Sequence, residues 1–131
     1  IGYRLVGSEM CIRDRPISKI TECVNFAEAQ TKKLGLRAPM VGHLGDGNFH
    51  VILPYDPKEE GTYNKIRDFS DLLIEKTLEL NGTITGEHGV GLHKKAYLLK
   101  EHGDCIPLMK SIKRSIDQNN IMNPGKIFDL N

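Results

Sequence analysis

Two glycine-punctuated strings contain the residue types that bind divalent metal ions. The first is GHLGDGNFH, which begins at Gly42, and the second is GTITGEHGVG, which begins at Gly82. Together they supply two imidazoles, one carboxylate and a further histidine, from His43, His50, Glu87 and His88. Two neutral imidazoles and a carboxylate leave open positions on Zn, Mn or Fe, and a metal held in this way polarises a bound oxygen. The strings therefore predict a divalent metal site with a base beside it.

The spacing within the first string requires a chain reversal. His43 and His50 are seven residues apart, so on one continuous strand their side chains would face opposite ways. The intervening Gly-Asp-Gly-Asn run tolerates positive φ and favours a hairpin-like bend, which returns both histidines to the same side. Glu87 lies between Gly86 and His88 in a second tight loop and is the best candidate for the carboxylate ligand.

Other interpretations use the same residues. A lone histidine is usually a surface or hydrogen-bonded residue, and His93 and His102 are interpreted in that way. Two histidines and a glutamate would also suit a zinc hydrolase, although that enzyme needs a complete pocket that a short chain barely provides. A structural metal module is a further alternative, and His88 argues against it because a structural site needs no base beside its ligands.

The two strings, followed by Asn-Pro-Gly-Lys-Ile at 123–127, resemble the C-terminal part of the FAD-linked oxidases related to vanillyl-alcohol oxidase. That family includes respiratory D-lactate dehydrogenases, glycolate oxidase flavoprotein subunits and D-2-hydroxyglutarate dehydrogenases. The resemblance implies that His43, His50 and Glu87 hold a divalent metal. It also implies that His88 takes the substrate hydroxyl proton as hydride passes to the flavin, and that Asn123 lies near the flavin.

The resemblance implies FAD- and metal-dependent oxidation of a small D-2-hydroxy acid to the 2-oxo acid. Ile52 occupies the position of a substrate-contacting asparagine in the hydroxyglutarate dehydrogenases. An apolar residue there favours D-lactate or glycolate over a dicarboxylate, whose second charge would need a partner, unless Ile52 simply packs in the core. D-2-hydroxyglutarate oxidation is the alternative. An alkyl-glycerone-phosphate synthase would use flavin differently, and the metal-type string with both histidines argues against it.

Length and the first residues shape the expected domain organisation. A chain of 131 residues holds one modest core, and no strand is followed by a GxGxxG turn, so the FAD-binding domain is expected elsewhere. Residues 16–131 are predicted to be the C-terminal part of a cap domain, within a fragment. Residues 1–15 include LVGSEMCIRDR, which resembles a translated sequencing adapter and is interpreted as a non-native lead. If it is genuine, it is too short and too charged to span a membrane.

The charge composition limits the kinds of molecule that this protein is expected to bind. The 18 basic and 17 acidic residues give a net charge of +1, so nucleic acid is not indicated. The expected partners are a small 2-hydroxy acid, the protein's own FAD domain, and an electron acceptor such as quinone, cytochrome c or a flavoprotein. With no segment of membrane-span length, a cytoplasmic location or one peripheral to the respiratory membrane is expected, mitochondrial in a eukaryote. Cys23 and Cys105 are predicted to be small buried thiols, which suits a reducing compartment.

Hydrophobic periodicity predicts an α+β scaffold. Helices are expected at 16–34, 59–80 and 105–118, a short helix is expected to contain Lys94 and Lys95, and strands are expected at 40–44, 48–55 and 83–85. Gly35 and Asn81-Gly82 are expected to end the first two helices. The inward faces are predicted to include Ile66, Phe69, Leu73, Thr77, Leu80, Met109, Ile112 and Ile116. Helices on one face of a small antiparallel sheet would form part of a ferredoxin-like cap.

Overall fold

The structure, a computed structural model, describes residues 6–12, 17–42, 44–56, 58–85 and 88–130. The chain divides into two compact units, Ile1–Glu87 and His88–Asn131. Among the described residues, no helix is both long enough and apolar enough to cross a membrane.

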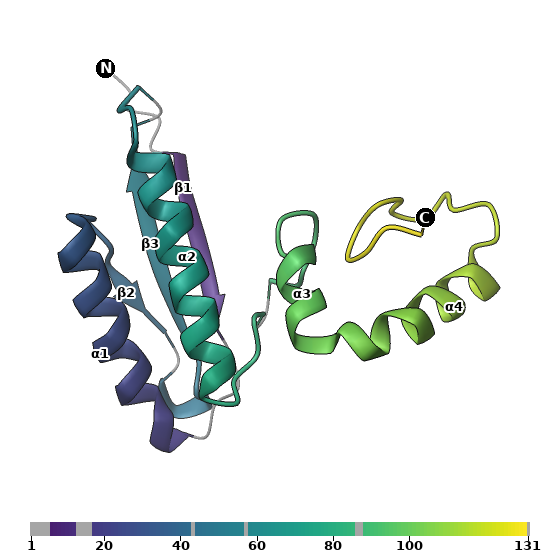
Figure 1. Cartoon of the computed structure of the whole chain (residues 1–131), viewed down its shortest axis with the longest axis horizontal. Helices are drawn as coiled ribbons and strands as arrows, with labels where there is room; N and C mark the ends of the chain where they lie inside the picture. The colour runs from purple at the N-terminus through teal and green to yellow at the C-terminus, as the bar shows by residue number, and fades with distance from the viewer. Residues whose placement is uncertain (1–5, 13–16, 43, 57, 86–87, 131) are drawn as a thin grey trace. The chain divides into compact units, whose positions relative to one another are not determined.

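The first unit is an antiparallel sheet covered by two helices. Its elements follow the order β1 (Val6–Ile12), α1 (Ile17–Leu34), β2 (Met40–Val41), β3 (Phe49–Tyr55) and α2 (Thr62–Glu79). β3 lies in the middle of the sheet and pairs antiparallel with both β1 and β2. Figure 1 shows α1 and α2 side by side on the sheet. The α+β class is confirmed, and the β-α-β-β-α order is that of the first five elements of a ferredoxin-like motif.

β1 lies in the segment that the sequence analysis excluded from the fold. Val6 is opposite Tyr55 and Ile12 is opposite Phe49 in the pairing with β3. Periodicity missed this strand because pairing along an open sheet edge uses main-chain groups and does not require an amphipathic side-chain pattern. The non-native origin of residues 1–15 remains a prediction, because a foreign segment can also pair with an edge.

The core of the first unit lies between β3 and the helices. Phe49, Val51 and Leu53 alternate along β3 and are at most 1% exposed. The predicted inward face of α2 is confirmed, since Ile66, Phe69, Leu73, Thr77 and Leu80 are all buried. α1 contributes the buried residues Ile20, Cys23, Ala27 and Thr31, so the prediction for Cys23 is also confirmed.

Both helix ends in this unit follow the predicted signals. α1 ends at Leu34, and Gly35 takes φ 67°. After α2, Asn81 takes φ 57° and the Gly82 N–H donates to the Thr77 carbonyl at 2.9 Å, which is left-handed capping. α2 begins later than expected because Gly61, with φ 84°, precedes its first turn.

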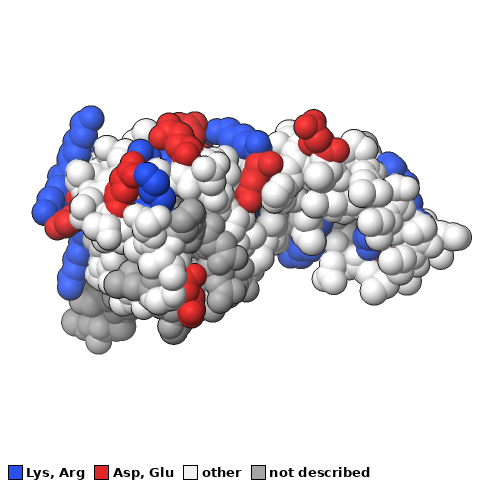
Figure 2. All heavy atoms as spheres, turned by 90° about the horizontal axis from the view of Figure 1, so that it is seen from below, with Lys and Arg blue, Asp and Glu red and all other residues white. Residues whose placement is uncertain are grey.

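A salt bridge joins the two helices. The Lys76 ammonium lies 3.0 Å from the Glu22 carboxylate. The hydrogen bond from Lys76 lowers the pKa of Glu22, and the same bond raises the pKa of Lys76. Figure 2 shows basic and acidic side chains interspersed over this unit on the face in view.

The second unit contains α3 (Lys95–His102), a 3-10 turn (Gly103–Cys105) and α4 (Ile106–Ile116), followed by an irregular C-terminal segment. That segment returns to the start of the unit, because the Ile127 N–H donates to the Gly91 carbonyl at 2.8 Å and Lys95 pairs with Asp129 at 2.8 Å. The Asp117 carboxylate accepts from the backbone N–H groups of Ile121 and Met122 at 3.0 and 2.9 Å. These contacts hold the segment against α3 and α4.

Three sequence predictions fail in regions with few neighbours. Ile112 and Ile116 were expected to face inward but are 51% and 73% exposed, because no described element of this unit covers that side of α4. Cys105 is exposed rather than buried, since it belongs to the turn before α4. Residues 83–85 make only an isolated bridge at Thr83, because three residues pair too briefly to form a strand.

Candidate functional site

The β2–β3 hairpin carries the first histidine string. β2 ends at Val41, a 3-10 turn covers Leu44–Asp46, and Gly47 takes φ 72° before β3 begins. The predicted reversal is therefore present, although strand β2 is shorter than expected because the turn starts at Leu44. Val41 lies opposite His50 in the register. His43 itself lies outside the described residues.

Gly42 determines how tightly this hairpin closes. A Cβ atom at Gly42 would lie 2.5 Å from the Asn48 carbonyl oxygen and 2.5 Å from the Phe49 Cα. Real Cβ atoms do not come so close to backbone, so only glycine fits there without displacing the strand. Because Gly42 has no side chain, its backbone can lie directly against the start of β3.

His50 lies on β3, on the side opposite the residues that pack under the helices. The strand alternates, so Phe49 and Val51 face the core while His50 and Ile52 share the other face. His50 is nevertheless only 7% exposed, and Ile52 is half-buried. The Ile52 N–H donates to the Pro39 carbonyl at 2.9 Å, which extends the pairing beyond β2. The predicted sharing of one face by His50 and Ile52 agrees with this register.

Asn48 is a residue that sequence reasoning missed as a site candidate. It is 0% exposed, and neither its side-chain Nδ2 nor its Oδ1 has a hydrogen-bond partner. In the sequence it appeared as a turn-forming residue in the Gly-Asp-Gly-Asn run and as the first residue of the strand expected at 48–55. Its spacing from His50 could have identified it. Asn48 precedes His50 by two residues, and residues two apart share one face of an extended chain.

The second string is described only in part. Ile84 is 1% exposed and anchors the segment, and the Thr85 Oγ1 is buried without a hydrogen-bond partner. Glu87 lies outside the described residues, as His43 does. Within the described part of the chain, no group of three His, Cys, Asp or Glu side chains could hold a metal ion. The structure thus places one predicted ligand, His50, and leaves the ligand set as a prediction.

His88 and Asn123 belong to the second unit. His88 is exposed and precedes Gly89, which has φ 72°. Asn123 is exposed, takes φ 48° and precedes Pro124 and Gly125, so the predicted turn is confirmed. The Ile127–Gly91 hydrogen bond links the segment after Asn123 to the loop that follows His88. The roles of His88 as base and Asn123 as flavin contact remain predictions.

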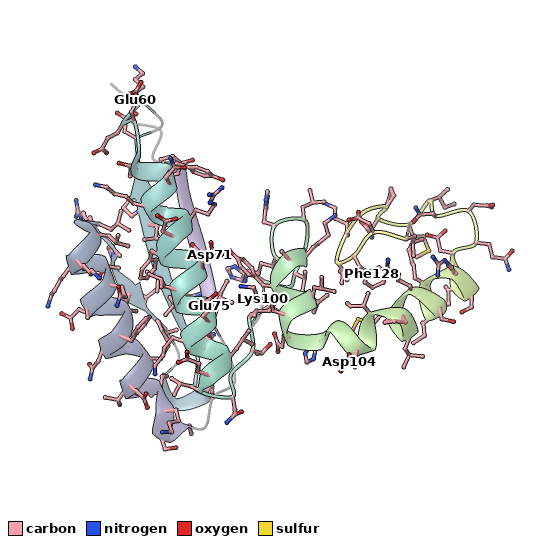
Figure 3. All side chains as sticks on the ribbon, viewed as in Figure 1. Glu60, Asp71, Glu75, Lys100, Asp104 and Phe128 are labelled. Carbon is pink, nitrogen blue, oxygen red and sulfur yellow. The ribbon has the colours of Figure 1, made fainter. Side chains whose placement is uncertain are left out.

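An apolar groove occupies the second unit. It has a volume of about 460 Å³, and its apolar lining includes Leu98, Met109, Ile112, Ile116, Ile127 and Phe128. Figure 3 labels Phe128 on the C-terminal segment, on the side toward α4. The Lys113 ammonium binds the Asp117 carboxylate at the end of this groove and lowers the pKa of Asp117, with help from the two backbone N–H groups. This unit therefore presents a mainly apolar groove, and the Lys113–Asp117 ion pair is part of its lining.

The family that matches this chain is described as FAD linked oxidases, C-terminal domain, and it matches residues 10–127. The chain belongs to this family. It is 35% identical over 128 residues, or 97% of its length, to a mitochondrial D-lactate dehydrogenase (cytochrome) of Arabidopsis thaliana, of which it covers 22%. It is 39% identical over 116 residues, or 86% of its length, to a glycolate oxidase subunit of Bacillus subtilis, of which it covers 24%.

A third relative is a D-2-hydroxyglutarate dehydrogenase of Stutzerimonas stutzeri, which is 39% identical over 90 residues. That match includes 66% of this chain and 19% of the relative. The chain spans about a quarter or less of the length of these three relatives. The matches therefore establish the C-terminal domain, and the activity of a whole protein is a separate question.

Proposed function

We propose that this chain is the metal-bearing C-terminal part of an FAD-dependent dehydrogenase that oxidises a small D-2-hydroxy acid, D-lactate or glycolate. The observation that carries the proposal is the hairpin of the first string. It buries His50 on the strand face of Ile52 and packs Gly42 on the start of that strand. Membership of the FAD-linked oxidases and the names of the relatives support the same activity.

The proposed metal ligands are His43, His50 and Glu87. Two imidazoles and one carboxylate fit a first-row divalent ion, and the hairpin reversal between Val41 and Phe49 suits a site at this bend. The bound ion would act as a Lewis acid toward the substrate oxygens. Zinc, manganese and iron are all compatible with this donor set, so the identity of the metal is left to measurement.

The remaining roles rest on the chain's own residues. His88 is proposed to accept the proton of the substrate hydroxyl, and Asn123 to contact the flavin. Ile52 shares the face of His50, is half-buried, and would present an apolar wall to the substrate. Such a wall favours a small monocarboxylate over a dicarboxylate, whose second charge would be left without a partner. Oxidation of D-2-hydroxyglutarate is the second candidate, and the 39% identical relative of that name favours it.

The proposed protein partners are the flavin-binding domain of the same protein and an electron acceptor. The apolar groove and the exposed Ile112 and Ile116 give the second unit a surface suited to the flavin-binding domain. Quinone, cytochrome c and an electron-transfer flavoprotein are candidate acceptors, and three relatives carry cytochrome in their names. Four relatives are named as mitochondrial, so a location at the respiratory membrane is proposed for a eukaryotic source.

The test uses the complete protein that carries this chain, purified with its flavin. Elemental analysis should find one divalent ion per chain, and D-lactate or glycolate should bleach the oxidised flavin absorbance under anaerobic conditions. His43→Gln and His50→Gln should lose the ion and the bleaching. His102→Gln, which changes an exposed histidine outside both strings, should keep both. Full metal content in both ligand variants would refute the ligand set, and bleaching by D-2-hydroxyglutarate alone would select the second candidate.

A further inference from the structure

We propose that Asn48 binds the carboxylate of the 2-hydroxy acid, with its side-chain Nδ2 donating the hydrogen bond. This inference rests on the proposed function, because it names the ligand of the same site. The sequence did not suggest this role, because Asn48 follows Gly-Asp-Gly in the first string and resembles an ordinary turn residue. The argument comes from its burial, its missing partners and its place immediately before β3.

The Asn48 side chain is buried at a cost in stability. It is 0% exposed, yet both its donor and its acceptor lack a partner. Most buried polar groups in folded proteins are hydrogen-bonded, and an unsatisfied one destabilises the fold. A leucine of similar size would avoid that penalty at this position. A buried amide without partners is therefore expected where a ligand completes its hydrogen bonds.

The position of Asn48 points to the proposed metal and substrate site. It lies two residues before His50 and four before Ile52, so the three residues follow one face of an extended chain. Gly42 lies close to the Asn48 backbone, because a Cβ atom at Gly42 would lie 2.5 Å from the Asn48 carbonyl oxygen. Among the described residues of the first unit, Thr85, two residues before Glu87, is the other one with an unpaired buried side-chain atom. Both unpaired side chains thus precede a proposed metal ligand at the same spacing.

The Nδ2 donor of the amide fits a carboxylate, because an ionised carboxylate only accepts hydrogen bonds. Nδ2 supplies a hydrogen-bond donor without adding a positive charge to a site that would also hold the proposed metal ion. Hydrogen bonds to a charged acceptor are shorter and stronger than bonds between neutral groups. Every 2-hydroxy acid and its 2-oxo product carries such an acceptor, so this contact would hold both through the reaction.

The experiment measures pyruvate binding and thermal unfolding in the complete flavin- and metal-loaded protein. Asn48→Leu should weaken pyruvate binding by about tenfold to a hundredfold in titration calorimetry, as expected for a lost bond to a charged group. Its thermal midpoint without ligand should stay level or rise, and its metal content should not change. Asn64→Leu, an exposed asparagine on α2, is the matched control and should bind pyruvate normally.

The possible outcomes separate the inference from the proposed function. Normal pyruvate binding by Asn48→Leu would overturn the role of Asn48. Weaker binding together with a lower thermal midpoint would overturn it too, because the variant would then be destabilised. Neither result would refute the proposed function. A wild-type protein that neither binds pyruvate nor shows flavin bleaching by any 2-hydroxy acid would refute both. If Asn48→Leu does not fold, Asn48→Ser decides between the same outcomes, because the shorter hydroxyl is polar but cannot reach the same acceptor.

Discussion

At the scale of single residues, Gly42 has the least room for change. A Cβ atom there would lie 2.5 Å from main-chain atoms of both Asn48 and Phe49, and backbone cannot rotate away as a side chain can. Gly42→Ala should therefore lower the free energy of unfolding by about 1–3 kcal/mol, the usual range for overpacking. Gly45→Ala is the matched control, because a Cβ at Gly45 meets nothing within 4 Å.

Urea unfolding of the purified chain measures this difference. Gly45→Ala should stay within about 0.5 kcal/mol of the wild type, as surface substitutions usually do. Metal content should also fall in Gly42→Ala in the complete protein, since the strand that carries His50 would move. Equal stability of the two alanine variants would show that the close approach of Gly42 does not constrain the hairpin.

The Asp117 carboxylate gives a second residue-scale prediction, on pH. The Lys113 hydrogen bond lowers its pKa, and the N–H groups of Met122 and Ile121 act in the same direction. A lowered pKa in the folded state means that the stabilisation is complete above the ordinary value of about 3.9. It is lost as the pH falls through the lowered pKa. Asp117→Asn should therefore melt below the wild type at pH 7, and the gap should narrow below about pH 4.

Thermal melts between pH 2 and pH 7 test this pH dependence. Asp104→Asn serves as the control, because Asp104 is an exposed carboxylate in the same unit (Figure 3). Its midpoint should follow the wild type at every pH. A gap between Asp117→Asn and the wild type that is constant with pH would mean that the side chain acts through shape rather than charge.

Sequence alone could predict those parts of the candidate site that follow from strand alternation or from turn-forming residues. Alternation places His50 and Ile52 on one strand face, and the glycine-rich run predicts the reversal that the hairpin makes. It could not predict the burial of Asn48, because asparagine in a Gly-Asp-Gly-Asn run is normally an exposed turn residue. That burial depends on how closely Gly42 packs, which is a three-dimensional property.

At the scale of elements, α2 holds the first unit together. Phe69 and Leu73 are completely buried, whereas Leu72 on the same helix is 39% exposed. Phe69→Ala should cost about 3–5 kcal/mol, which combines the lost burial of an aromatic ring with the cavity that it leaves. Leu72→Ala removes a side chain of similar chemistry from the exposed side and should cost about 1 kcal/mol or less.

Chemical denaturation followed by circular dichroism would rank these two variants. If Leu72→Ala proved as destabilising as Phe69→Ala, the assignment of the α2 inner face would be wrong. This face was predictable because a helix of 18 residues repeats its apolar positions several times. The β1 pairing was not predictable, since its strand shows no such repeat and is defined by the β3 edge that it meets.

At the scale of the whole molecule, the second unit presents more apolar surface than it can cover. α4 has the apolar spacing of a core helix, which is why the sequence predicted an inward face for Ile112 and Ile116. Within its own unit these side chains are 51% and 73% exposed, and with Met109 and Phe128 they line the 460 Å³ groove. Apolar surface of this kind commonly marks a contact with another part of a protein.

Charging this surface should therefore impair assembly with the proposed flavin domain. In the complete protein, the double variant Ile112→Glu and Ile116→Glu should lower flavin occupancy and D-lactate oxidation at least tenfold, because two carboxylates would enter an apolar contact. The double variant Ser111→Glu and Ser115→Glu adds the same charge at exposed positions of α4 outside the groove lining and should retain both. Flavin absorbance per chain gives the occupancy. Equal occupancy in the two variants would show that the groove contacts water in the assembled protein, and the partner of α4 would then have to be sought on another face.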